Sequence, residues 1–421
     1  LPVDTEVASM RVVRGLSAVF LLVTIVAPAL AEDEAPPSLA DLVERAGEVR
    51  IEMRAADEYE QAAAAYREIL EAMTTLDRDE LEGTDAIDFD LLRSHLETRL
   101  FEIEEVELHK LVPNRYFSLW TTDNLFVRPC AQPDSAVADA RDELEKLPEI
   151  LANAKQNLTR PARTWTENAI YNAWYAELLL GKLDEVCVDD PALKREFLAV
   201  GETALAAVSD YKAWMESELL PRSDRSPAWK PEEIERYQFG HEQLMDYGVD
   251  EMIRVAEADE AETLAAMEAL ADRIHPSGDL ETVWDLMKDE APPWDEVFAM
   301  AERYVELADE WLRGEGDHLV DIPEAFDYGV QITSPMGRRI LSFGGATYGP
   351  TLAGRISGYY VLTPLESRLS DEEKASRIRS YNPYWTHVIS YHEWLGHNVQ
   401  RAIAEANPQT PTRRMFNSSY L

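Results

Sequence analysis

Apolar side chains recur every three to four residues along most of the chain, which is the spacing of amphipathic helices. Within residues 38–73, for example, Leu42, Val43, Ala46 and Ile69 follow this spacing. The same pattern predicts further helices over residues 88–111, 135–154, 161–183, 191–218, 231–272 and 293–315. Several of these segments begin at or beside a proline, which suits the first turn of a helix. The sequence therefore predicts a mainly α fold.

The pattern changes over residues 321–364, which hold seven of the 18 glycines of the chain. Residues 330–333 and 358–362 are rich in β-branched and aromatic side chains, and they read as short strands between loops. A helical pattern returns over residues 370–390. We therefore expect a small β segment, followed by a C-terminal helix.

Residues 10–31 have the layout of a cleavable secretory signal. A basic stretch with Arg11 and Arg14 precedes an apolar run, and a pattern of small residues ends at Ala31. The alternative is a membrane anchor, but the apolar run over residues 16–26 is shorter than the roughly 20 residues that a spanning helix needs. We expect cleavage after Ala31, export to the periplasm or outside the cell, and no stable membrane span in the mature chain.

These patterns divide the chain into three parts. Residues 1–31 comprise upstream residues and the signal peptide. Residues 32–320 form a helical domain. Residues 321–421 carry the small β segment and the C-terminal helix, and they belong to the same unit as the helical domain.

The charge and the cysteine content exclude several function classes. The chain has 80 acidic and 40 basic residues and a net charge of -40, so nucleic acid or an anionic membrane surface is not the expected partner. Two cysteines are too few for a disulfide scaffold or a cysteine-based zinc finger. Cys130 and Cys187 either form a disulfide, which export permits, or remain unpaired core residues. A metal ion would need histidine and carboxylate ligands.

The sequence HEWLGH carries the candidate chemistry. In the related HExxH pattern, two His four residues apart bind zinc and the Glu acts as general base. Here His392 and His397 are five apart, and on a regular α-helix roughly 500° of rotation would separate their rings by about 140°. A π-type turn returns both positions to one face, and Gly396 tolerates such a distortion. We expect this turn to bring the imidazoles within about 3–4 Å of each other, with Glu393 beside them. The alternative is two ordinary histidines on a polar helix face.

A resemblance to one bacterial family is carried by the segments AIDFDLLRSHLETRLFEIEEVELHKLVPNRY, GHEQLMDYGVD and SGYYVLTPLE, and by HEWLGHNVQ followed by RRMFNSSYL. Together they resemble the family called domain of unknown function 885, whose members are mainly helical, often exported and regarded as metallopeptidases. The resemblance covers about residues 40–421 and is strongest from about residue 320. The family motif usually reads His-Glu, two variable residues, then Pro-Gly-His, whereas this chain lacks the Pro and is one residue shorter. The shortened motif is similar, over six residues, to the zinc motif of dipeptidyl peptidase III.

The resemblance implies a large helical, gluzincin-peptidase-like domain with zinc as its cofactor. His392 and His397 would be zinc ligands, and Glu393 would be the general base. The family's third ligand is a Glu in a Glu-Gly-Trp segment that follows residues like RRMFNSSYL, and the sequence stops at Leu421. Glu405 is a poor substitute, because it lies about 12 Å further along a continuous helix. We therefore expect a fragment without its third ligand and its last helices.

The expected function is that of an exported zinc peptidase acting on peptide substrates. The strand over residues 358–362 is expected to face Glu393 across a cleft and to pair with an extended substrate as an added edge strand. Tyr359 or Tyr360 would bind the substrate by donating to the developing oxyanion, and the alternative for each is strand packing. The rival function is that of a non-catalytic, exported, acidic helical binding or scaffold protein with a degenerate metal motif.

Overall fold

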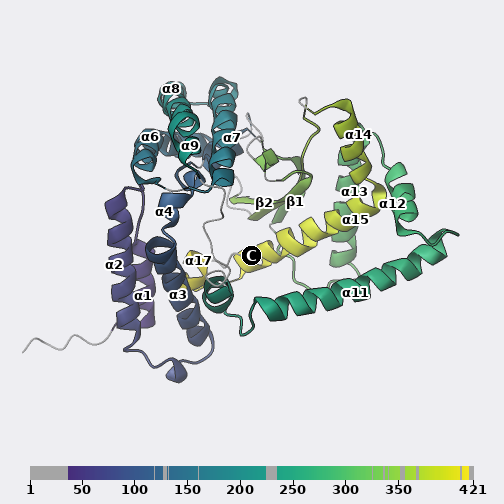
Figure 1. Cartoon of the computed structure of the whole chain (residues 1–421), viewed down its shortest axis with the longest axis horizontal. Helices are drawn as coiled ribbons and strands as arrows, with labels where there is room; N and C mark the ends of the chain where they lie inside the picture. The colour runs from purple at the N-terminus through teal and green to yellow at the C-terminus, as the bar shows by residue number, and fades with distance from the viewer. Residues whose placement is uncertain are drawn as a thin grey trace, which may run out of the picture. The chain divides into compact units, whose positions relative to one another are not determined.

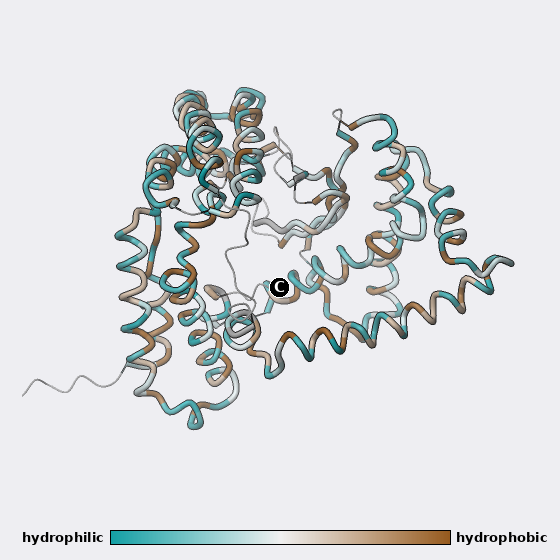
Figure 2. Tube along the Cα trace, in the orientation of Figure 1, coloured by the Kyte–Doolittle hydropathy of each residue, from teal (hydrophilic) through white to brown (hydrophobic). Residues whose placement is uncertain are grey.

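Helices dominate the structure, a computed structural model that describes residues 37–117, 119–126, 130, 132–159, 161–223, 235–324, 326–334, 337–339, 341–350, 356–366, 369–407 and 410–416. Polar and apolar positions alternate around most of the helices (Figure 2). The predicted mainly α fold is therefore confirmed. The predicted signal peptide and its cleavage site lie outside the described residues. Within the part of the chain that is described, no helix has the length and apolar character needed to cross a bilayer.

The first predicted helix, over residues 38–73, is two helices in the structure. The helices and turns of this region are α1 (Leu39–Glu48), α2 (Ala56–Met73), η1 (Arg78–Glu80) and α3 (Thr84–Leu100). Val49 is extended and Arg54 has a φ of 58°, so the backbone turns between α1 and α2. Ser38 begins α1 with a capping box, in which Ser38 and Asp41 each accept a backbone N–H of the other. The apolar faces of α1, α2 and α3 share one core.

The next region surrounds a second core. Its elements are η2 (Phe101–Glu105), α4 (Leu108–Leu111), η3 (Pro113–Tyr116), α5 (Trp120–Leu125), α6 (Asp134–Asn157), α7 (Arg163–Leu180), η4 (Leu183–Glu185), α8 (Pro191–Trp214), η5 (Met215–Leu219) and α9 (Leu220–Arg222). Helices α6, α7 and α8 contribute the fully buried Leu144, Ala173 and Phe197 (Figure 1). The sequence did not predict α5, because its six residues are too short to establish a helical period.

Cys130 and Cys187 form a disulfide, with their Cα atoms 4.7 Å apart. Of the two alternatives that the sequence left open, the structure therefore contains the bonded one. The disulfide joins the segment before α6 to the segment before α8. Between the same segments, the Asp134 carboxylate accepts the backbone N–H groups of Asp189 and Asp190.

The remaining helical elements lie before, within and after the β segment in sequence. They are η6 (Glu235–Glu242), α11 (Val249–Ile274), α12 (Leu280–Asp289), α13 (Trp294–Arg313), η7 (Gly337–Arg339), α14 (Asp371–Ser380), α15 (Pro383–Tyr391), η8 (His392–Val399), α16 (Gln400–Ala406) and α17 (Pro411–Met415). The helix predicted over residues 231–272 is interrupted between η6 and α11, and residues 231–234 lie outside the described residues. The helix predicted over residues 370–390 is interrupted before Pro383, because proline has no backbone N–H to continue the hydrogen bonds of α14.

The β segment forms a three-stranded sheet in the order β1-β3-β2. Its strands are β1 (Phe326–Ile332), β2 (Gly344–Pro350) and β3 (Ile356–Leu362). β3 pairs in parallel with β1 and antiparallel with β2 along its whole length. The prediction that residues 358–362 form a substrate-binding edge strand is therefore wrong, because β3 is central and both of its hydrogen-bonding edges are occupied. The sequence missed β2, whose three glycines and one proline are unusual in a strand.

A third core joins the sheet to the helices around it. Tyr360 of β3, Val305 of α13 and Trp394 of η8 are nearly inaccessible to solvent in this core. Figure 1 shows the sheet beside the helix formed by α15 and η8, and both β2 and β3 contact η8. Residues 37–421 form one compact unit, and the division at residue 320 stays a prediction.

His95 on α3 is expected to make the stability of the fold depend on pH. Its ring centroid lies 4.2 Å from that of Phe416 and 6.3 Å from that of Tyr66. Burial, and then the charge of Arg99, lower the pKa of His95 to about 4, while Glu102 acts in the opposite direction. Because an unfolded His has a pKa of about 6.5, the unfolded state takes up this proton first as the pH falls. The contribution of neutral His95 should be complete above about pH 6.5 and should fall by about 3 kcal/mol by pH 4.

Urea unfolding of the wild type and of His95→Gln at pH 7 and pH 5 measures this contribution. The wild type should lose about 2 kcal/mol more free energy of unfolding between these pH values than the variant does. His318→Gln is the matched control, because the side chain of His318 is 71% exposed. Equal pH dependence in the wild type and in His95→Gln would contradict the prediction.

Candidate metal centre

The HEWLGH motif lies wholly within a π-helical segment. Asn382 caps the preceding helix α15 by accepting the backbone N–H of Trp385 at 3.0 Å, and Pro383 occupies the first turn. The helix then widens into η8 over His392–Val399 and returns to α-helical geometry in α16. The distortion predicted from the five-residue spacing is therefore confirmed.

The π turn brings the two motif histidines together. The Nε2 atoms of His392 and His397 are 3.2 Å apart, and their ring planes are nearly perpendicular, at 85°. This separation agrees with the predicted 3–4 Å. Two zinc–nitrogen bonds of 2.0–2.1 Å at a tetrahedral angle place the two nitrogens about 3.3 Å apart, so the pair fits a zinc ion. The same distance also suits a hydrogen bond between two neutral imidazoles.

The electrostatic surroundings favour neutral His397. Burial, and then the neighbouring His392, lower the pKa of His397. A neutral imidazole has the free lone pair that a metal ion requires. His392 and His397 are both exposed, so an ion can reach them from solvent.

Glu393 lies on the inner side of the same turn. Its side chain is only 7% exposed, and this burial raises the pKa of Glu393, although the charge of His392 acts in the opposite direction. Among the described residues, no three His, Cys, Asp or Glu side chains are grouped closely enough to hold a metal ion. Glu393 is thus within electrostatic reach of His392, and its place beside the histidine pair stays a prediction.

The predicted cleft between Glu393 and residues 358–362 stays a prediction, but another part of the motif segment touches this strand. Asn398 of η8 packs directly against Gly358 of β3, so the motif turn and the strand are in contact there. Helix and strand approach this closely because Gly358 has no side chain to hold them apart.

Tyr359 and Tyr360 alternate across β3, and only Tyr360 belongs to the core around the motif. Tyr360 is 2% exposed, and its pKa is raised mainly by burial and further by Tyr381 and Glu393. Tyr359 is half-buried on the other face of the strand. The structure therefore brings Tyr360 within electrostatic reach of Glu393, while substrate binding by either tyrosine stays a prediction.

Glu405, judged a poor zinc ligand from its spacing, has another partner in the structure. Its carboxylate accepts Nε of Arg401 at 3.1 Å and Nη2 at 3.0 Å. This ion pair along α16 directs Oε1 of Glu405 at Arg401.

A row of buried polar side chains on the motif helix was not predicted from the sequence. Thr386, Ser390, Trp394 and Asn398 are four residues apart, and each is at most 1% exposed. Each has a side-chain polar atom that makes no hydrogen bond within the described part of the chain. A spacing of four is the signal that would have placed them on one helix face.

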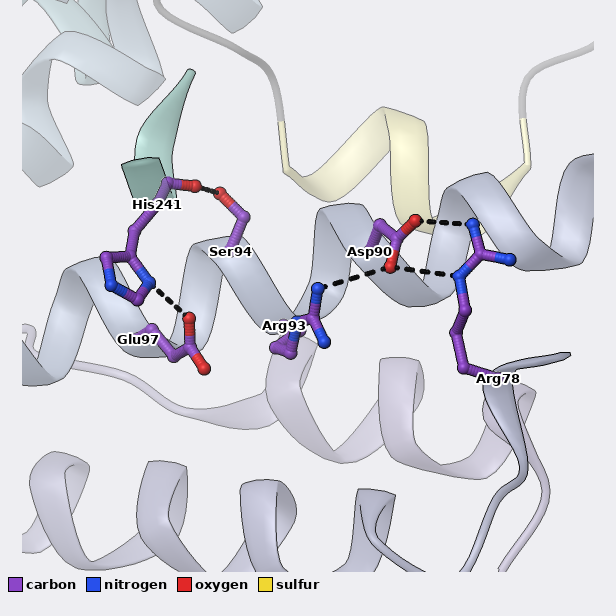
Figure 3. Close-up of polar contacts among 6 residues, drawn as sticks. All are labelled: Arg78, Asp90, Arg93, Ser94, Glu97 and His241. Carbon is purple, nitrogen blue, oxygen red and sulfur yellow. Dashed lines mark hydrogen bonds and ion pairs between the residues drawn. The ribbon is translucent and has the colours of Figure 1, made fainter. Parts of the chain in front are cut away.

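His241, the other histidine followed by glutamate, has a structural role in a different part of the fold (Figure 3). Its Nδ1 lies 2.5 Å from Oε2 of Glu97, and its backbone carbonyl accepts the hydroxyl of Ser94. Its ring also stacks on Tyr237, with centroids 5.0 Å apart. The contacts with Glu97 and Ser94 attach η6 to α3.

The chain is similar to one protein family and to a solved structure. A family model described as "Bacterial protein of unknown function (DUF885)" matches residues 42–421. A solved structure described as "a putative lipoprotein of unknown function from Shewanella oneidensis" is similar, with a TM-score of 0.63 and 15% sequence identity. This similarity covers 91% of the chain and 75% of the other chain, and at such identity it shows a shared fold alone. No curated protein matches the chain.

Proposed function

Because the chain belongs to the bacterial family of unknown function designated DUF885, we propose that it is an exported, zinc-dependent peptidase with its metal site at the HEWLGH turn. The observation that carries this proposal is the 3.2 Å separation of the His392 and His397 Nε2 atoms. An arrangement that needs a π turn to form is informative, because such turns occur frequently at functional sites.

The residues of the turn have distinct roles in this proposal. His392 and His397 would hold the zinc ion. When bound, zinc supplies a Lewis acid that makes a water molecule acidic enough to react near neutral pH. Glu393 would act as the general base that takes a proton from the attacking water. Its raised pKa suits this role, since a base works best when its pKa is close to the working pH.

Export is proposed from the signal-like residues 10–31 and from two compatible observations. The chain contains a disulfide, and such bonds persist in oxidising compartments. The similar protein from Shewanella oneidensis is itself described as a putative lipoprotein. The proposed substrate is a peptide, in agreement with a net charge that disfavours nucleic acid.

The competing proposal is a non-catalytic, exported helical binding protein whose motif has lost its metal. The lack of a third grouped ligand among the described residues favours it. The two proposals differ in what they expect from zinc. A peptidase centre binds zinc at the histidine pair. A degenerate motif binds no zinc, and its two imidazoles are joined only by the hydrogen bond between their Nε2 atoms.

A zinc titration followed by thermal and urea unfolding tests the metal site. At a free zinc concentration of 100 times Kd, the wild type should gain about 2.7 kcal/mol of stability. His392→Ala and His397→Ala should each abolish this gain. His387→Phe is the matched control, because His387 is exposed on α15 and a Phe ring keeps its stacking on Tyr304. Equal stabilisation of the wild type and of both alanine variants would refute zinc binding at this pair.

A further inference from the structure

A glycine of the sheet, Gly358 of β3, lies directly against the motif segment η8. A Cβ atom added to Gly358 would lie 2.5 Å from Oδ1 of Asn398 and 2.8 Å from both Cβ and Cγ of the same residue. Both residues are buried. Carbon atoms in van der Waals contact are usually about 3.5–4.0 Å apart, so a side chain at position 358 would overlap Asn398.

Rotation of the Asn398 side chain does not remove this overlap. A new rotamer would move Oδ1, but Cβ of Asn398 is fixed to the backbone of η8. The backbone of the π turn must therefore move if position 358 carries a side chain. Asn398 directly follows His397, so this movement would be transmitted to one of the two imidazoles.

The contact acts through shape rather than through hydrogen bonds. Neither Oδ1 nor Nδ2 of Asn398 has a hydrogen-bond partner among the residues that the structure describes. Gly358 also lacks the positive φ that would require glycine for backbone reasons, since the described residues with positive φ do not include it. The remaining reason for glycine at this position is the space that Asn398 occupies.

We propose that Gly358 and Asn398 are positioning residues for the histidine pair, an inference that rests on the proposed zinc site. Gly358 forms a flat seat on β3, Asn398 rests on this seat, and the contact sets the depth of the π turn against the sheet. The 3.2 Å separation of the His392 and His397 Nε2 atoms thus depends on a residue 39 positions before His397 in the sequence.

A double-mutant cycle of Gly358→Ala and Asn398→Gly tests the contact between these two residues, called the seat. Gly358→Ala should weaken zinc binding roughly 10–100-fold, the loss typical of changes just outside the ligands of a metal. Asn398→Gly removes all three overlapping atoms, so Gly358→Ala/Asn398→Gly should bind zinc more tightly than Gly358→Ala. Gly240→Ala is the matched control, because Gly240 lies in the separate π-helical segment η6 and its added Cβ would meet no atom of the described residues within 4 Å. Zinc affinity is measured by competition with a chromogenic chelator.

A metal-free measurement separates this inference from the proposed function. In zinc-free protein, the NMR ring resonances of His392 and His397 should shift in Gly358→Ala, remain as in the wild type in Gly240→Ala, and return toward the wild type in the double variant. If the wild type binds no zinc but the resonances follow this pattern, the peptidase proposal fails and the seat stands. If Gly358→Ala leaves both the resonances and the zinc affinity unchanged, or if Asn398→Gly does not rescue it, the seat is refuted.

Discussion

Replacing Glu393 with Gln should leave zinc binding intact and lower kcat for peptide hydrolysis about 10²–10⁴-fold, the range that a positioned general base contributes. Gln has nearly the same shape as Glu, so the packing of this buried side chain is retained. The amide has no lone pair basic enough to accept the proton of the attacking water. The change therefore removes the base and keeps the two histidines that hold the metal.

The measurement combines zinc titration with mass spectrometry of a mixed peptide pool incubated with the zinc-loaded protein. Glu405→Gln is the matched control, because Glu405 follows the motif on α16 and is paired with Arg401. The control should hydrolyse peptides like the wild type. Full activity in Glu393→Gln would show that another group accepts the proton. Loss of zinc from this variant would instead make Glu393 part of the metal site.

The π turn could be predicted from sequence because it is a local consequence of one spacing. Two histidines five residues apart reach one metal ion only if the helix widens, so the chemical hypothesis also specified the backbone. The structure has the π-helix over the same residues, and the two Nε2 atoms lie within the predicted range. Whether this pair binds zinc is a separate question, which the titration addresses.

The order of the strands in the sheet could not be predicted from local sequence in this way. The sequence predicted strands near residues 330 and 360 but placed the second at an edge. Strand order depends on the path of the chain after β1, and the glycine-rich β2 occupies the second edge of β3. No residue within β3 predicts that β2 will pair with it. An error in the order of three strands therefore changed the expected role of residues 358–362.

The contact between Gly358 and Asn398 joins the π turn, which could be predicted from the sequence, to the sheet, whose strand order could not. Either residue alone is unremarkable in the sequence, since glycine is common in this segment and Asn398 simply ends the motif turn. They become important when β3 and η8 pack together, because the side chain of Asn398 fills the space that Gly358 leaves open. Non-local complementarity of this kind becomes visible only in three dimensions.

Removing the disulfide by Cys130→Ser/Cys187→Ser should lower the free energy of unfolding by about 2–4 kcal/mol. The two cysteines are 57 residues apart in sequence, so the bond closes a long loop in the unfolded chain. In the chain-entropy model, releasing a loop of this size favours the unfolded state by about 4 kcal/mol at 25 °C. The folded state should change little, because the Asp134 carboxylate still joins the two segments through Asp189 at 2.9 Å and Asp190 at 2.8 Å.

Urea unfolding with and without a reductant distinguishes the effect of the bond from that of the substitutions. Both cysteines are exposed, so a reductant can reach the bond in the folded protein. Reductant should shift the unfolding midpoint of the wild type to that of the double variant and should leave the variant unchanged. Equal stability of reduced and oxidised wild type would show that the bond does not restrain the unfolded chain. A loss in the predicted range would instead mean that the native fold depends on an oxidising compartment, as the proposed export requires.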